Sequence, residues 1–245
     1  MIRKLFSAGH EKGSLKSSRR NHEIQRIETF SDGVFAFAVT LLIVSLEVPK
    51  SFEELLITMR GFFAFGISFL ILVSIWNEQH RFFRSYGLED LWTLTLNGIL
   101  LFLVLFYVYP LKFLFSLMFG DQIYGPKNSP FTISQHQVPS LMMIYSLGFM
   151  AIYSLFFLMY LHANRNYKRL GLTAVEKFDC KSTMYRLLIM ILTGFSAFIA
   201  AMILKDEHAG WAGFIYFLIG PSIWIMFSFR GKFRKKLFPQ AKPSE

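Results

Sequence analysis

The sequence predicts an all-α membrane protein with six transmembrane helices per subunit and both termini in the cytoplasm. Three observations lead to this fold class. Of the 245 residues, 53% are hydrophobic and only 17% are charged, a balance too apolar for an ordinary soluble domain. Six apolar runs approach the length of about 20 residues that a helix needs to cross a bilayer. Lys and Arg residues concentrate on alternate connections between these runs.

The first span, at residues 27–48, begins with polar side chains and continues as an apolar helix. No charged residue lies between Gly33 and Leu46, and at 1.5 Å per residue the span covers about 30 Å. Pro49 then closes it. Charged residues at the beginning of such a helix are costly unless they are paired or hydrated. We therefore expect a polar network at this end.

Loops and basic connections separate the later spans. The connection at residues 120–137 is rich in Gly, Pro, Asn and Ser, as exposed loops are, and residues 162–186 form a basic connection. The strand-length alternation typical of a membrane β-barrel does not recur. The remaining helical spans are expected at residues 54–76, 91–119, 138–161, 187–204 and 211–229.

The distribution of charge predicts how the chain is oriented. If the N-terminus is inside, 21 of the 26 Lys and Arg residues fall on the cytoplasmic side and five on the outer side, which is a strong positive-inside signal. The first residues lack the apolar core of a signal peptide. We expect a basic cytoplasmic tail at residues 1–25, a six-helix transmembrane domain at residues 26–230 and a basic cytoplasmic tail at residues 231–245. The protein is predicted to be a multi-pass protein of the plasma membrane.

Charge and composition also exclude several classes of function. The net charge is +10, but the basic residues lie between apolar runs rather than on one helix face, so we expect no nucleic-acid partner. Cys180 is the only cysteine, which excludes a disulfide framework or a Cys-based metal site within one chain. No paired carboxylates, metal-spaced histidines or Ser-His-Asp set suggests an active site. Neither an enzyme nor a resident cofactor or metal is expected.

Three motifs in the first half of the chain suggest a family. They are RxxxFSD from Arg26, WNxxH from Trp76 and LNxxLLF from Leu96. In this order they resemble the prokaryotic branch of the transmembrane protein 175 family, the lysosomal potassium channel family. The resemblance implies a homotetrameric, potassium-selective channel with passive conduction, in which the first helix of each subunit lines the pore. Potassium would be the permeant ion, and the partners would be other copies of the chain and the lipid bilayer.

The same resemblance implies a pore without a P-loop selectivity filter, and the sequence contains no TVGYG. A secondary transporter of a cation or small solute is the alternative function. Such a transporter would favour internal repeats, whereas RxxxFSD occurs once. Passive, electrogenic flux would distinguish a channel from substrate-coupled turnover.

The resemblance also assigns residues to the pore. It places a hydrophobic constriction at Phe37, Leu41 and Val44, where the family usually has Ile at the first position, and it associates Thr40 with the ion path and selectivity. At 100° per residue, the three constriction residues fall within an arc of about 60° on one helix face, and Thr40 flanks Phe37 by about 60°. Stacked apolar rings of this kind can gate a pore by dewetting.

A second group of residues is expected to form a structural polar network at the cytoplasmic end of the first helix. In this hypothesis Arg26 braces Ser31 or Asp32, and polar side chains of the second and third spans meet them. The expected members are Arg26, Ser31, Asp32, Trp76, Asn77, His80 and Asn97.

Overall fold

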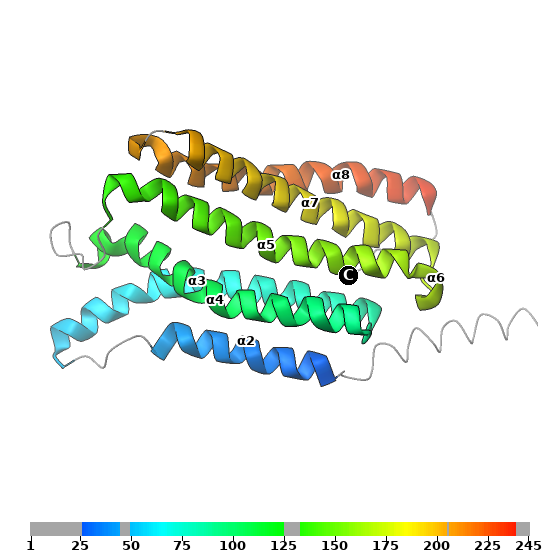
Figure 1. Ribbon diagram of the computed structural model, residues 1–245, viewed down its shortest axis with the longest axis horizontal. Coiled ribbons are helices and arrows are strands. Elements are labelled where there is room, and N and C mark those ends of the chain that lie inside the picture. The colour runs from blue at the N-terminus through cyan, green and yellow to red at the C-terminus, as the bar shows by residue number, and fades with distance from the viewer. Residues whose placement is uncertain (1–25, 45–49, 125–132, 205, 239–245) are drawn as a thin grey trace, which may run out of the picture.

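The computed structural model describes residues 26–44, 50–124, 133–204 and 206–238, and in these ranges it contains helices and no strands (Figure 1). The all-α class is therefore confirmed for the described part of the chain. Two of the helices, η1 and η2, are 3-10 helices. In chain order the elements are α2 Arg26–Val44, α3 Phe52–Tyr86, α4 Leu91–Tyr124, η1 Gln135–Gln137, α5 Val138–Arg165, α6 Tyr167–Leu170, α7 Ala174–Ile203, η2 Asp206–Leu218 and α8 Ile219–Leu237.

Five segments of the described residues are long and apolar enough to cross a membrane. They are Met59–Tyr86, Leu91–Gly120, Gln135–Arg165, Ala174–Ile203 and Gly210–Arg234. The length and composition of these helices identify the chain as a multi-span membrane protein. Helix α2 is not in this set. The span predicted there runs to residue 48, and residues 45–48 lie outside the described residues. The total of six spans and the orientation of the termini stay predictions.

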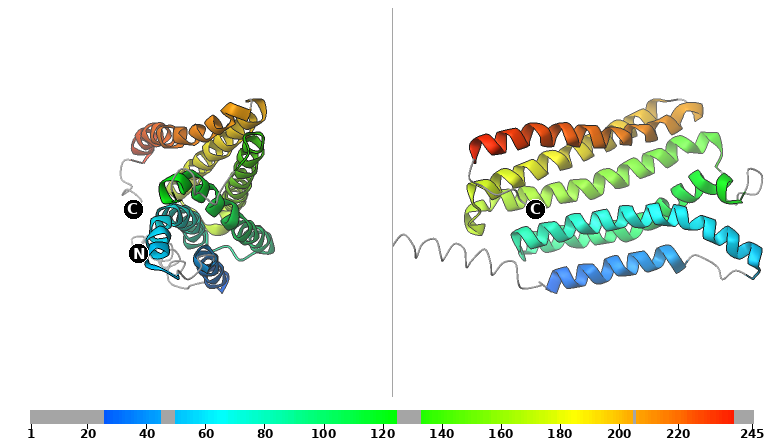
Figure 2. Two further views of the ribbon diagram at one scale, coloured as in Figure 1. Left: turned by 90° about the vertical axis from the view of Figure 1, so that its left-hand side faces the viewer. Right: turned by 180° about the vertical axis from the view of Figure 1, so that it is seen from behind.

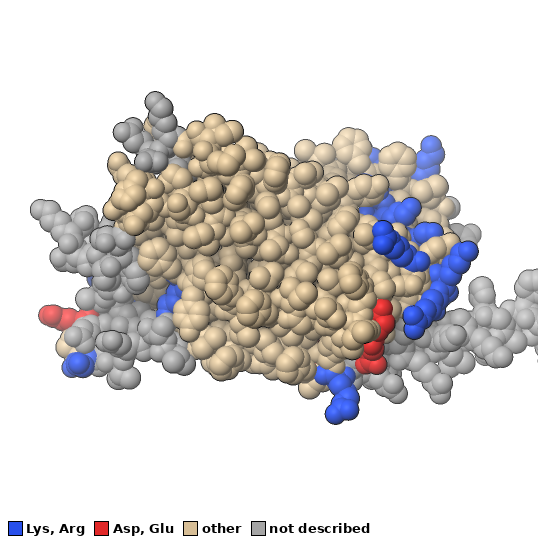
Figure 3. All heavy atoms as spheres, in the orientation of Figure 1, with Lys and Arg blue, Asp and Glu red and all other residues tan. Residues whose placement is uncertain are grey.

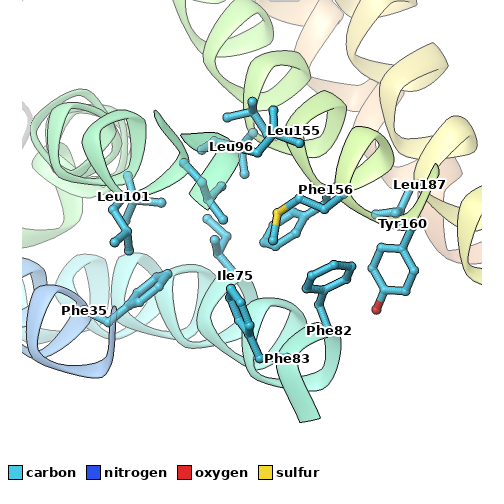
Figure 4. Close-up of a cluster of buried hydrophobic side chains, with 14 of the residues drawn as sticks. Phe35, Ile75, Phe82, Phe83, Leu96, Leu101, Leu155, Phe156, Tyr160 and Leu187 are labelled. Atoms are coloured by element: carbon cyan, nitrogen blue, oxygen red, sulfur yellow. The ribbon is translucent and has the colours of Figure 1, made fainter. Parts of the chain in front are cut away.

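The long helices lie side by side in one elongated bundle (Figures 1 and 2). Helix α2 runs along one side next to α3 and α4, α5 lies in the middle, and α7 and α8 form the opposite side. Where α3, α4 and α5 meet, aromatic side chains fill the interior, among them Phe82, Phe156 and Tyr160 (Figure 4). Many large apolar side chains face outward instead, as expected where lipid or another subunit covers the helices.

Several helices extend beyond the spans that hydropathy predicts. Helix α3 continues ten residues past Trp76 and ends at Tyr86, before Gly87, whose φ of 54° is in the left-handed region that glycine tolerates. Helix α7 begins at Ala174, because Thr173 caps it. The Glu176 backbone N–H donates to the Thr173 hydroxyl, and the Thr173 backbone N–H donates to the Glu176 carboxylate. Hydropathy locates the apolar part of a helix, whereas capping decides where it begins.

A short cluster joins the α3–α4 connection to α5. Asp90 accepts a hydrogen bond from the Thr93 hydroxyl at 2.5 Å, and its other carboxylate oxygen lies 2.6 Å from His162 Nε2. Burial raises the pKa of Asp90, but the bonds from Thr93 and His162 outweigh it, and the net pKa lies below its usual value. This cluster fixes the start of α4, which positions Asn97 for the site described next.

Candidate functional site

Helix α2 has two chemically different faces. Its buried face carries Glu28, Ser31, Phe35, Ala38 and Leu42, at the spacing of three and four residues that puts side chains on one side of a helix. Its other face, which includes Phe30, Phe37 and Thr40, is exposed in the single chain. The polar side chains that enter the protein are therefore near the N-terminal end of α2, and the exposed face is mainly apolar.

One turn of α3, residues 76–80, holds the polar end of α2. Trp76 Nε1 donates to Asp32 Oδ1 at 2.7 Å, and His80 Nδ1 lies 3.0 Å from Glu28 Oε1, at ion-pair distance. The Trp76 and His80 rings stack on each other with centroids 5.5 Å apart. Two side chains of α3 thus meet two carboxylates on successive turns of α2, which fixes the rotation of α2 against α3.

A chain of buried amides and hydroxyls adds α4 to this arrangement. Gln79 Nε2 donates to Asn97 Oδ1 at 3.0 Å, and Asn97 Nδ2 donates to Ser31 Oγ at 3.0 Å. The Ser31 hydroxyl in turn donates to the Ile27 carbonyl at 2.7 Å. Ser31, Gln79 and Asn97 are all buried, and buried polar groups that are hydrogen-bonded specify one packing arrangement. We call Glu28, Ser31, Asp32, Trp76, Gln79, His80 and Asn97 the α2–α3–α4 network.

The structure brings together five of the seven residues that the sequence suggests for the network. Ser31, Asp32, Trp76, His80 and Asn97 make the contacts just described. Arg26 and Asn77 are exposed, and within the described ranges neither has a hydrogen bond or ion pair. Asp32 accepts from an indole N–H rather than from a guanidinium, because Arg26 projects from the opposite face of α2.

Sequence reasoning missed two members of the network, Glu28 and Gln79. Glu28 is one of several charged residues at the beginning of the first span. Its distance of three residues from Ser31 and seven from Phe35 places it on the buried face, and this spacing is the signal that could have found it. Gln79 gave no such signal, because an amide between charged residues is equally compatible with an exposed helix end.

The residues expected at the pore occupy different environments. Phe37 is 57% exposed, and the exposed Thr40 donates its hydroxyl to the Phe37 carbonyl at 2.7 Å. Leu41 is half-buried and packs against the hydrophobic core. Val44 ends α2, and its side chain lies outside the described residues. Phe37 and Thr40 therefore share the outward face, while Leu41 lies at its border.

The other end of α2 is joined to α4 by a cation. Lys112 Nζ donates to the Leu42 carbonyl oxygen at 3.0 Å. The last carbonyls of a helix lack intrahelical donors, and a positive charge near them also compensates the helix dipole. Helix α2 is thus attached to its neighbours at both ends, by the α2–α3–α4 network at one and by Lys112 at the other.

A further buried ion pair connects the same turn of α3 to the other side of the bundle. Arg186 Nη2 of α7 lies 2.6 Å from Glu78 Oε2, and both side chains are largely buried. Glu78 precedes Gln79, so the turn at residues 76–80 contacts α2, α4 and α7. Sequence reasoning missed this pair because it counted Arg186 with the cytoplasmic charges.

We expect Asp32→Ala to destabilise the protein by about 1–3 kcal/mol, because it leaves the Trp76 N–H without its charged acceptor. Thermal unfolding of the purified protein measures the effect. The control is Glu89→Ala, which removes an exposed carboxylate and should leave the midpoint unchanged. If Asp32→Ala instead melts like the parent and loses ion selectivity, the carboxylate acts on the ion and not on the fold.

Comparison with known proteins places the chain in a family. The family model described as endosomal/lysosomal potassium channel TMEM175 matches residues 26–107. A potassium channel of Marivirga tractuosa is 40% identical over 223 residues, which cover 86% of this chain and 88% of that protein. The chain belongs to the TMEM175 family. The resemblance suggested by the three sequence motifs is confirmed.

Further proteins are similar to this chain in sequence or in fold. Potassium channel Cha6605_3372 of Chamaesiphon minutus is 35% identical over 41% of this chain and 53% of its own length. The crystal structure of a threonine-to-alanine variant of the potassium channel MtTMEM175 matches with a TM-score of 0.76 and 36% identity, over 87% of this chain and 96% of that one. A TMEM175 homologue from Chamaesiphon minutus has the same fold at a TM-score of 0.54 and 24% identity, over 84% and 96% of the two chains.

The region matched by the TMEM175 family model coincides with the site. Residues 26–107 run from the start of α2 into α4. They include the whole α2–α3–α4 network together with Phe37, Thr40 and Leu41, whereas Arg186 lies outside.

Proposed function

We propose that this chain is a subunit of a potassium-selective cation channel that conducts passively through a homotetrameric pore lined by α2. The relatives that cover most of the chain are potassium channels by name. The observation that carries the proposal is the division of α2 into two faces. Its polar end is tied into the subunit by the α2–α3–α4 network, and a mainly apolar face with Phe37 and Thr40 points away from the subunit.

This geometry suits a pore made by several subunits. One helix cannot enclose a pore, but the outward faces of several α2 helices around a symmetry axis can. Phe37, Leu41 and Val44 would then form stacked apolar rings, at which an ion loses part of its hydration shell. Six spans with both termini inside complete the proposal, supported by the asymmetric distribution of Lys and Arg.

The proposal is tested by reconstituting the purified protein in liposomes loaded with potassium. A channel gives electrogenic flux that depends on the membrane potential and does not saturate at low ion concentrations. Cross-linking of the same preparation should give species up to tetramers. Turnover that requires a second solute would favour the alternative, a secondary transporter, and cross-linking that stops at dimers would contradict the four-fold pore.

Thr40→Ala is expected to lower the preference for potassium over sodium by roughly 2–10-fold, the effect of losing one hydroxyl interaction of about 0.5–1.5 kcal/mol. The total potassium flux should change by a smaller factor than the ratio of potassium flux to sodium flux. The control is Thr95→Ala, because the Thr95 hydroxyl is also exposed and also bonds its own helix, at the Leu91 carbonyl. Equal selectivity in the parent and Thr40→Ala would remove the hydroxyl from the ion path.

A further inference from the structure

The last two turns of α8 carry lysines and apolar side chains together. Lys and Arg residues gather at this end of the bundle (Figure 3), where α6, the beginning of α7 and the end of α8 lie. On α8, Lys232 and Lys236 are exposed. Neither has a hydrogen bond or ion pair within the described part of the chain. Two ammonium groups are therefore available to a ligand.

The arginines of the same turns bind side chains of α7 instead. Arg234 makes a bidentate contact with Asp179 of α7, at 3.0 Å and 3.2 Å. Arg230 donates to the Ser182 hydroxyl at 2.7 Å, and its guanidinium lies over the Phe178 and Tyr185 rings, 4.4 Å and 4.7 Å from their centroids. These contacts hold the end of α8 against α7. They therefore fix which side of α8 faces away from α7.

An apolar stripe runs next to the two lysines. Phe229, Phe233 and Leu237 are 62%, 60% and 59% exposed, and their spacing of four residues puts them within an arc of about 80°. By the same arithmetic Lys232 and Lys236 border the stripe on the side away from Arg230 and Arg234. A helix end with an apolar stripe beside free lysines suits the boundary between acyl chains and headgroups.

We propose that Lys232 and Lys236, together with the stripe of Phe229, Phe233 and Leu237, bind the headgroup and upper acyl chains of an anionic phospholipid. We call these five residues the α8 headgroup site. Lysine ammonium groups donate charge-assisted hydrogen bonds to phosphate oxygens. Basic clusters directly beyond the cytoplasmic end of a transmembrane helix recognise anionic lipids in general. The site joins such a cluster to an apolar surface.

The position of α8 favours lipid over another copy of the chain. Helix α8 lies on the opposite side of the bundle from α2 (Figure 1). If α2 lines the central pore, as proposed above, α8 faces outward from the assembly. The exposed Ile225, one turn before Phe229, continues the apolar surface of α8 into the span. The charge of the two lysines complements a phosphate, whereas a second copy would bring its own lysines to the same place.

Native mass spectrometry of the detergent-solubilised full chain tests the site. The protein is titrated with short-chain phosphatidylglycerol and, as reference, with phosphatidylcholine of the same chain length. We expect tighter binding of phosphatidylglycerol. In the double variant Lys232→Gln, Lys236→Gln this preference should fall by about fivefold for each lysine removed, at low ionic strength. The matched control is Lys168→Gln, Arg169→Gln, which removes two exposed charges from α6 at the same end.

Four results would overturn the proposal. The first is equal binding of both lipids by the parent, and the second is a loss of preference in the control as large as that in the Lys232→Gln, Lys236→Gln variant. The third is displacement of phosphatidylglycerol by soluble glycerol phosphate at equal concentration, which would identify a free phosphate as the ligand. The fourth is dissociation of the double variant into smaller oligomers, which would make this face a contact between copies. The double variant should keep the potassium flux of the parent, so a failure of the lipid-binding proposal can be told apart from a failure of the proposed channel function.

Discussion

Phe37→Ala is expected to raise the fluxes of potassium and sodium together, by about tenfold or more in liposomes. Phe37 points away from the subunit and is 57% exposed, so a ring of phenyl groups from several subunits would narrow the pore. Removing the rings lets ions keep more of their hydration shell, and each 1.4 kcal/mol taken from the barrier raises the rate about tenfold. Discrimination between the two ions should fall at the same time.

The control for Phe37→Ala is Phe217→Ala, which truncates an exposed phenylalanine of η2, on the side of the bundle away from α2. Its fluxes should equal those of the parent. Unchanged fluxes in Phe37→Ala, with the protein folded and assembled as the parent is, would place the constriction elsewhere on α2.

Glu78→Ala is expected to lower the free energy of unfolding by about 3–5 kcal/mol. Glu78 is 6% exposed and lies 2.6 Å from Arg186, and removing one partner leaves the other as an uncompensated buried charge. Chemical or thermal unfolding of the purified protein measures the loss. Arg186→Leu alone should cost a similar amount.

The double variant Glu78→Met, Arg186→Leu is the decisive control. Replacing a buried ion pair by apolar side chains of similar volume is often neutral or stabilising, so the double variant should recover most of the loss. If the double variant instead loses as much stability as the matched single variants Glu78→Met and Arg186→Leu added together, the pair contributes no coupling energy.

Together these variants distinguish the expected role of α3 in stability from the expected role of α2 in ion flux. Side chains of α3 at residues 76–80 contact α2 through Trp76, α4 through Gln79 and α7 through Glu78. Changes at this turn should act on stability, because they break buried contacts within the subunit. Changes on the outward face of α2 should act on flux, because that face makes few contacts in its own subunit.

The sequence was sufficient for the class and the family of the protein. Hydropathy depends on composition over about 20 residues, so the apolar runs are readable without any tertiary information. The RxxxFSD, WNxxH and LNxxLLF motifs indicated the TMEM175 family, and the comparison with the Marivirga tractuosa channel confirms it. Five of the seven expected network residues do meet, since Ser31, Asp32 and their partners carry polar groups that a membrane helix must satisfy.

Tertiary structure alone decided which groups are partners and which faces are exposed. Trp76 and Asp32 are separated by 44 residues, and Arg186 and Glu78 by 108, so their pairing depends on the rotation of packed helices rather than on local sequence. That rotation turns Arg26 outward, brings Glu28 to His80 and moves Leu41 toward the core. A helix rotates by 100° with each residue, and packing of all the helices against one another selects the angle.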